Sequence, residues 1–130
     1  MATETKSVVR TERAPAPFQG APYSQAIQAG GFVFVSGQLG LKPDDAEIAG
    51  SIAEQTEQIF ANLKAILEEA GTALERLVKT TVFLTDLGDF AGMNEVYARH
   101  VGEMPPARAT VEVAALPSGA KVEIEAIAQI

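Results

Sequence analysis

The sequence has no cysteine and a single histidine, His100. Without cysteine the chain cannot form disulfides, thiolate nucleophiles or cysteine-ligated metal sites, and one histidine cannot supply a multi-histidine metal site. We therefore expect no metal centre, and we interpret His100 as a surface or packing residue near a helix end.

Positive charge and long apolar segments are also scarce. Ten Lys and Arg residues stand against seventeen Asp and Glu, for a formal net charge of -7. This balance argues against a broad nucleic-acid interface, because phosphate binding needs clustered cations. No apolar run approaches the roughly 20 residues that span a bilayer, and the amino terminus lacks the apolar core of a signal peptide. These absences predict a cytoplasmic protein that binds no membrane.

The composition is that of a globular protein. With 130 residues, of which 47% are hydrophobic and 21% charged, the chain can bury the core of one domain. We expect a single domain over residues 1–130. Within it, residues 1–18 are predicted to form a loose tail, or a short edge strand at Ser7 to Thr11, because Pro15 and Pro17 disfavour a helix.

Two strands are predicted before residue 40. Ala26 to Gln28 and Phe32 to Gln38 are the candidates, joined by Gly30-Gly31, a dipeptide suited to a tight hairpin turn. Gly37 lies inside the second strand, where glycine costs stability, so we expect either a bulge or strand end, or the close approach of another backbone or of a ligand. We interpret Gln38 to Gly50 as a polar loop.

Two helices and a buried strand are predicted next. Ser51 and Glu54 have the spacing of a capping box, and Gly71 is suited to end the helix that follows. Leu77 to Leu84 has the composition of a buried strand, and Asp86 is a candidate cap for the second helix. The stripe of that helix, most of which we expect in the core, comprises Phe90, Met93, Asn94, Tyr97 and Val101.

The last stretch, Pro105 to Ile130, has the pattern of two strands. Apolar and polar residues alternate in both halves, and Pro117-Ser118-Gly119 supplies a turn, so we expect a hairpin. Such pairing would put Glu112 opposite Glu123, with Arg108 at the end of the same face. Opposed carboxylates disfavour one another across a sheet, so this face is either solvated or used by a site that combines an arginine with glutamates.

Together these elements predict an α+β domain with a mixed β-sheet. The helix between the Phe32 and Leu77 strands should make a crossover, which implies one parallel pairing. Two helices packed on one face leave the opposite face uncovered. Its apolar residues should favour burial against another subunit.

Several ordered blocks resemble those of one known family. The stretch from Pro106 to Ala128 resembles the carboxy-terminal signature of the RidA (YjgF) family, the reactive intermediate imine and enamine deaminases. The other matching blocks, in the family's order, are Pro22-Tyr23-Ser24-Gln25-Ala26, Val35-Ser36-Gly37-Gln38, Lys79-Thr80-Thr81-Val82-Phe83 and Asp89-Phe90, with Asn94 following. The resemblance covers about residues 17–130, and several blocks in order are more specific than one short motif.

The resemblance implies a chorismate-mutase-like fold that assembles as a homotrimer with pockets between adjacent subunits. It also implies hydrolysis of 2-imino or enamine acids, such as 2-iminopropanoate and 2-iminobutanoate, to 2-keto acids and ammonia without a cofactor. Arg108 matches the residue that binds the substrate carboxylate, and Glu123 matches the residue credited with directing water.

Further residues are implied as part of the substrate site. Tyr23 matches a pocket-lining aromatic, Gly37 a position whose backbone contacts substrate, and Asn94 a polar residue near the site. Phe90 is a plausible apolar wall. Thr110 stands where many members carry cysteine, next to Arg108, so its β-branched side chain alters the pocket lining.

Three other functions are weighed against this deaminase. One is a relative that acts on a different imine or enamine, since side-chain preference follows the pocket lining. Another is a binding module that senses a small carboxylate through Arg108 without turnover. The third is RNA cleavage, which has been described for family members and which the acidic charge and lone histidine disfavour here.

Overall fold

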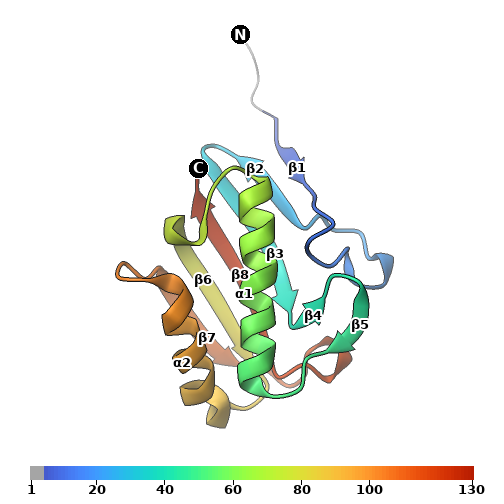
Figure 1. The fold of residues 1–130 in the computed structure, drawn as a ribbon, viewed down its shortest axis with the longest axis vertical. Helices are drawn as coiled ribbons and strands as arrows, with labels where there is room; N and C mark the ends of the chain where they lie inside the picture. The colour runs from blue at the N-terminus through green and yellow to red at the C-terminus, as the bar shows by residue number, and fades with distance from the viewer. Residues whose placement is uncertain (1–4) are drawn as a thin grey trace.

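The computed structural model describes residues 5–130 as a sheet covered on one face by two helices (Figure 1). The six-stranded sheet has the order β1-β2-β3-β8-β6-β7, and β4 and β5 form a separate two-stranded ribbon. The elements are β1 (Ser7–Val9), β2 (Ala26–Ala29), β3 (Phe32–Leu39), β4 (Leu41–Lys42), β5 (Asp45–Ile48), α1 (Ile52–Glu69), β6 (Leu77–Leu84), α2 (Phe90–Val101), β7 (Ala107–Glu112) and β8 (Val122–Gln129). The α+β class and the single helical layer are confirmed. None of the helices in residues 5–130 is both long and apolar enough to cross a membrane.

The amino-terminal part forms an antiparallel edge to the sheet. The expected edge strand is β1, which pairs with β2. The segment after it is held by the buried side chain of Gln25, which accepts from Thr11 N at 2.7 Å and donates to the carbonyls of Thr11, Ala14 and Pro15. The loose tail predicted at the start of the chain falls partly on residues 1–4, which lie outside the described residues.

The turn and cap predictions in the first half are confirmed. Gly30 and Gly31 join β2 to β3 with φ of 59° and 84°, values that favour glycine. At the start of α1, the Ser51 hydroxyl accepts from Glu54 N and the Glu54 carboxylate accepts from Ser51 N, each at 3.1 Å. Gly71, with φ 85°, follows the end of this helix.

The polar-loop prediction for Gln38 to Gly50 is wrong in part, because the segment contains the β4–β5 ribbon. Composition did not reveal these strands since both are short and carry only a few apolar residues. Leu41 and Ile48 pair across the ribbon and pack with Leu39 and Ala120 in a small second hydrophobic cluster. That burial organises a segment that is otherwise polar.

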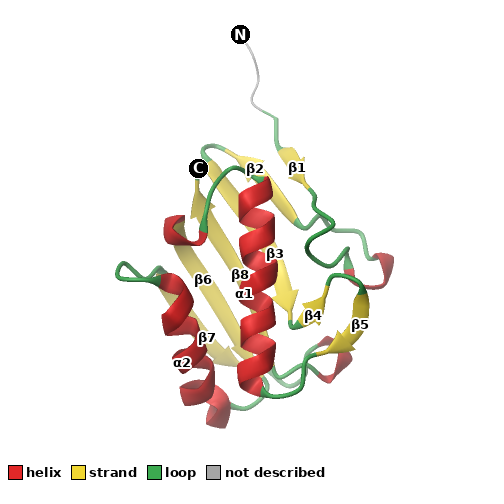
Figure 2. Ribbon diagram, viewed as in Figure 1, coloured by secondary structure: helices red, strands yellow, loops and turns green. Residues whose placement is uncertain are grey.

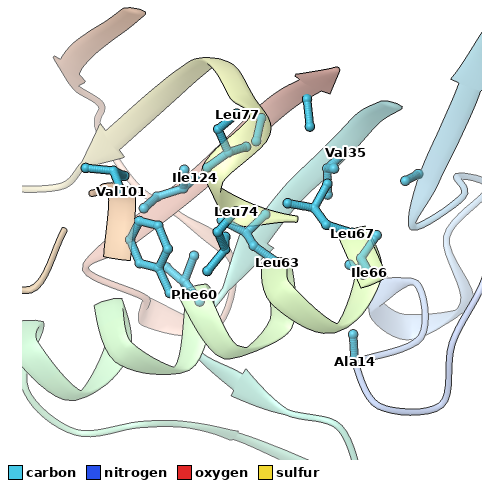
Figure 3. Close-up of a cluster of buried hydrophobic side chains, with 14 of the residues drawn as sticks. Ala14, Val35, Phe60, Leu63, Ile66, Leu67, Leu74, Leu77, Val101 and Ile124 are labelled. Atoms are coloured by element: carbon cyan, nitrogen blue, oxygen red, sulfur yellow. The ribbon is translucent and has the colours of Figure 1, made fainter. Parts of the chain in front are cut away.

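The main core lies between the helices and the sheet. Its side chains come from one face of α1, from α2 and from alternate positions of the strands, as Figure 3 shows for Phe60, Leu63, Leu67, Val35, Ile124 and Val101. Phe60 is fully buried, and its ring lies edge-on to Tyr97, with centroids 5.4 Å apart, and stacks on His100 at 4.7 Å. His100 also hydrogen-bonds Glu57 of α1. It is a packing residue near the end of α2, as expected.

The predicted carboxy-terminal hairpin is wrong. β7 and β8 are not neighbours, because β6 lies between them, parallel to β7 and antiparallel to β8 (Figure 2). The parallel pair is therefore β6–β7, joined by α2, whereas the Phe32 and Leu77 strands are separated by β8. The connection from residue 113 to residue 121 is long enough to pass one strand, since neighbouring strands lie only about 4.8 Å apart.

This topology places Arg108 and Glu123 on opposite faces of the sheet. Arg108 is directly opposite the buried Thr80 of β6, so its side chain leaves the sheet on the face covered by the helices. Glu123 alternates with the buried Val122 and Ile124, so it projects from the other face. Glu112 shares a face with Arg108, as the sequence predicted, but it does not pair with Glu123, which lies on the opposite face.

The face without helices is apolar over much of its area. Phe34 alternates with the buried Val33 and Val35, and it pairs with Ile27 on β2 and Ile127 on β8. The exposed large apolar side chains on this face, called the open face below, include Val8, Phe32, Phe34 and Val111. The expectation of an uncovered apolar face is confirmed.

Candidate functional site

The seven predicted site residues fall into two groups. Arg108, Phe90, Asn94 and Thr110 gather where α2 crosses β7, and Tyr23, Gly37 and Glu123 border a cleft beside β3 and β8. We call these the arginine half-site and the glutamate half-site. Within one subunit they do not meet, because Arg108 and Glu123 leave opposite faces of the sheet.

Aromatic rings hold Arg108 in the arginine half-site. Its guanidinium carbon lies 4.7 Å from the centroid of the Tyr97 ring and 5.5 Å from that of Phe90, both on α2. Within residues 5–130 the guanidinium makes no hydrogen bond or ion pair. Glu112, on the same face of β7, accepts instead from Leu87 N at 2.9 Å. The donors of Arg108 are thus available to an external acceptor.

Two further polar groups of this half-site have no partner. The side-chain Oδ1 of Asn94 and Oγ1 of Thr110 are buried and make no hydrogen bond to any of the residues from 5 to 130. Buried polar atoms are nearly always paired, so each of these can accept a hydrogen bond from a water, a ligand or another chain. A cleft of about 330 Å³ opens beside Asn94 and Arg108, and its lining comprises Asn94, Tyr97, Ala98, Val101, Gly102, Pro105, Pro106 and Arg108.

The glutamate half-site is a cleft of about 370 Å³. Tyr23, Gly37 and Glu123 all line it, as do Ser36, Gln38 and Glu125 among others. The ring of Tyr23 is oriented by its hydroxyl, which accepts from Phe18 N at 2.6 Å. Tyr23 is 42% exposed, so its ring is accessible from the cleft.

Gly37 gives Glu123 the space that its side chain occupies. The register between β3 and β8 shifts between Val35 and Gln38, so Ser36 and Gly37 together oppose Glu125 in a β-bulge. The Glu123 carboxylate folds over Gly37, and a Cβ at that position would collide with it. The bulge expected at Gly37 is thus confirmed, and the group that approaches this glycine is the Glu123 side chain rather than another backbone.

The environment of this cleft favours the protonated form of the Glu123 carboxyl, compared with a glutamate side chain in water. Burial raises the pKa of the Glu123 carboxyl above its ordinary value of 4.5, and the nearby charge of Glu125 raises it further. A carboxyl group with a raised pKa in a cleft can exchange a proton with a bound molecule near neutral pH more readily than an ordinary glutamate.

Sequence reasoning overlooked Tyr97 and Thr80 as parts of the site. Tyr97 was assigned to the core stripe of α2, and it is indeed buried, but one face of its ring also contacts Arg108. Thr80 hydrogen-bonds the Tyr97 hydroxyl at 2.6 Å. The signals for Thr80 were its polarity inside a strand predicted to be buried and its place in the matching block Lys79-Thr80-Thr81-Val82-Phe83.

Comparison with known proteins identifies the family to which this arrangement belongs. Residues 11–130 match the family model described as Endoribonuclease L-PSP. A RutC family protein of Pyrococcus abyssi is 54% identical over 124 residues, covering 95% of this chain and 96% of the relative. The chloroplastic Reactive Intermediate Deaminase A of Arabidopsis thaliana is 48% identical over 126 residues, covering 96% of this chain and 66% of the relative.

Solved structures agree in fold over almost the whole chain. RidA from the Antarctic bacterium Psychrobacter matches with a TM-score of 0.91 and 48% identity, covering 95% of this chain and 99% of that chain. Escherichia coli TdcF, solved with bound serine, matches with a TM-score of 0.89 and 41% identity, covering 95% and 98%. The chain belongs to the RidA family.

Proposed function

We propose that this protein hydrolyses reactive 2-imino acids, 2-iminopropanoate and 2-iminobutanoate, to 2-keto acids and ammonia. The observation that carries the proposal is the pair of complementary half-sites: an arginine without an acidic partner and a glutamate with a raised pKa. The first suits an anionic substrate, and the second suits proton transfer. The name of the Arabidopsis relative and the serine bound to TdcF support a small amino-acid-like substrate.

In this proposal the arginine half-site binds the substrate carboxylate. A guanidinium can donate two parallel charge-assisted hydrogen bonds to a carboxylate, and aromatic surroundings that exclude water strengthen them. Asn94 Oδ1 can accept a hydrogen bond from the imine or enamine nitrogen. Phe90, which is 41% exposed, forms an apolar wall, and Thr110 contributes a hydroxyl beside Arg108.

Glu123 directs water to the imine carbon. Its carboxylate accepts a proton from water as the oxygen bonds to the carbon of the protonated imine, and the electrons of the C=N bond move to nitrogen. The resulting neutral carbinolamine takes this proton from Glu123 onto its nitrogen. Its C–N bond then breaks to release ammonia, while its hydroxyl gives its proton back to the Glu123 carboxylate and becomes the keto group. One water is consumed and one ammonia released, and no cofactor is needed.

The proposal requires the two half-sites to come from different subunits. We infer a homotrimer in which the open face of each subunit packs on its neighbour, so that the arginine half-site of one subunit completes the glutamate half-site of the next. The apolar side chains of the open face favour such burial, and a cyclic trimer repeats one heterologous contact three times.

A coupled assay tests the reaction directly. A threonine dehydratase generates 2-aminocrotonate and its imine, and the release of 2-ketobutyrate is followed with and without this protein. We expect a clear acceleration that saturates with imine concentration. A rate equal to that of the buffer control at all protein concentrations would contradict the proposal.

Mixing subunits tests whether the half-sites are shared. Arg108→Ala and Glu123→Gln each disable one half-site, so each variant alone should be inactive. Co-expressed in equal amounts, they should recover about a quarter of wild-type activity, because about three quarters of random trimers are mixed and each mixed trimer has one intact site of three. Activity no higher than that of the single variants would contradict shared sites.

A second candidate is a binding module that senses a small carboxylate without turnover. The serine bound to TdcF favours it, since an arginine half-site suffices for binding. Saturable, Arg108-dependent binding of a keto acid by calorimetry, together with no acceleration in the coupled assay, would identify this function. The subcellular location stays a prediction, since relatives include a chloroplastic protein from Arabidopsis and a mitochondrial one from yeast.

Gly37→Ala offers a milder test of the glutamate half-site. The added methyl group meets only the movable end of the Glu123 side chain, so the fold should persist while the carboxylate is displaced. We expect kcat to fall by about tenfold to 100-fold, because misplacing a catalytic group by about 1 Å has effects of that order. Gly102→Ala is unsuitable as a control because its φ is 72°, whereas Ala61→Gly changes a methyl group on the exposed face of α1, away from both half-sites. Unchanged kcat with a stable fold would contradict the role of Glu123.

A further inference from the structure

In the part of the chain that the structure describes, the guanidinium of Arg108 contacts the faces of aromatic rings rather than acidic side chains, so its N–H donors remain free to bind a ligand. Its guanidinium carbon lies 4.7 Å from the centroid of Tyr97 and 5.5 Å from that of Phe90. Contact with the face of a ring attracts the cation without using an N–H donor. The donors can therefore all serve a ligand, provided that the ring keeps its place.

The ring of Tyr97 is itself fixed from two sides. Its hydroxyl and the hydroxyl of Thr80 share a hydrogen bond of 2.6 Å, and the two residues are 5% and 0% exposed. The edge of the ring meets Phe60 with centroids 5.4 Å apart and planes at 82°. Burial of both residues shields this hydroxyl pair from bulk solvent.

The hydrogen bond between Thr80 and Tyr97 joins two residues that lie at opposite ends of Arg108. Thr80 is the direct register partner of Arg108 across β6 and β7, so it lies beside the backbone of the arginine. Tyr97, from α2, contacts the guanidinium at the other end of the side chain. A hydroxyl pair that served only to join a helix to a sheet would not need to lie at this position.

We propose that Thr80 and Tyr97 are positioning residues that orient the guanidinium of Arg108 for a substrate carboxylate. The inference rests on the proposed function, in which Arg108 binds that carboxylate. Neither residue touches the reacting atoms. Their hydrogen bond keeps the ring, and through it the guanidinium, in one orientation before substrate arrives, which lowers the ordering cost of binding.

Two nearly isosteric variants test the assignment. Thr80→Val and Tyr97→Phe each remove one hydroxyl and keep the packing shape. We expect each to raise KM for 2-iminobutanoate and Kd for pyruvate by roughly tenfold, the effect of about one ordinary hydrogen bond, with kcat within about twofold of wild type. The double variant should bind no more weakly than either single variant, because all three lack the same bond.

Thr56→Val is the matched control. Thr56 is also fully buried, and its hydroxyl donates to the Ile52 carbonyl at 2.7 Å within α1. This variant should lose thermal stability on a similar scale and leave KM and Kd unchanged. If Thr80→Val and Tyr97→Phe behave as Thr56→Val does, lowering Tm without weakening carboxylate binding, the positioning role is overturned.

Pyruvate binding separates this inference from the proposed reaction. Wild type that binds pyruvate through Arg108 without hydrolysing imines would end the deaminase proposal, and the Kd values of the variants would still decide the roles of Thr80 and Tyr97. Wild type that binds neither pyruvate nor imine would overturn both.

Discussion

Replacing Arg108 with alanine is expected to lower kcat/KM for 2-iminobutanoate by about 100-fold to 1,000-fold. The variant loses two charge-assisted hydrogen bonds, each worth about 1.5–3 kcal/mol, and part of this loss is offset by water that enters the half-site. Within residues 5–130 Arg108 has no ion-pair partner, so its removal leaves no unpaired acid and the fold should be retained. The coupled dehydratase assay measures the effect, with circular dichroism to verify folding.

Arg99→Ala is the matched control for this experiment. Arg99 also lies on α2, and its surface ion pair with Glu57 at 3.4 Å has no connection to the cleft. Its removal should leave kcat/KM unchanged. Arg108→Lys should retain only part of the activity, because lysine keeps the charge but not the planar fork. An Arg108→Ala protein within about threefold of wild type would show that another group anchors the carboxylate.

Replacing Glu123 with glutamine is expected to lower kcat by about 100-fold to 10,000-fold, the usual range for losing a general acid–base group. The amide keeps the shape of the side chain over Gly37, so KM should change little. Single-turnover measurements with excess enzyme separate the chemical step from product release. A variant with unchanged kcat would remove Glu123 from the mechanism.

The pH dependence of the reaction provides an independent measure of Glu123. Because burial and then Glu125 raise its pKa above 4.5, the carboxylate needed for water activation should form at a higher pH than for an ordinary glutamate. Activity should therefore rise with pH through this raised pKa. Glu125→Gln removes the neighbouring charge and should move that rise to lower pH, whereas Glu75→Gln, on a distant turn, should not.

The Glu123 carboxyl should make stability fall as pH rises, whereas it makes activity rise. A carboxyl group with a raised folded-state pKa favours folding fully below 4.5, and this contribution is lost as pH rises through the folded-state pKa. Glu123→Gln removes this pH-dependent loss. At neutral pH the inactive variant should therefore unfold at a higher temperature than wild type, as is common where an active site holds a disfavoured charge.

Local signals in the sequence predicted local structure well. The Gly30-Gly31 turn, the capping box of Ser51 with Glu54, and the helix end at Gly71 depend on neighbouring residues, so they could be derived without knowing the fold. The β4–β5 ribbon was overlooked because its stability comes from burial against residues distant in sequence.

The carboxy-terminal pairing could not be derived in the same way. Alternation of polar and apolar residues tells which side chains of a strand share a face, but it does not tell which strand is its neighbour. The insertion of β6 between β7 and β8 put Arg108 and Glu123 on opposite faces, and so changed the expected single site into two half-sites. The sequence showed that an arginine and a glutamate belong to the site. The faces of the sheet on which they lie could be known only from the strand order and register.

The bulge in β3 has a consequence for how this sheet can evolve. The pairs before it, such as Val35 with Ala126, and those after it, such as Gln38 with Ile124, would form one uninterrupted ladder if a single residue between them were deleted. Strand pairing therefore does not require the extra residue. Selection for the fold alone would allow a one-residue deletion here. The length of this segment in other chains of the same fold should therefore distinguish chains that keep space for a glutamate side chain at the position of Glu123 from chains that lack this space.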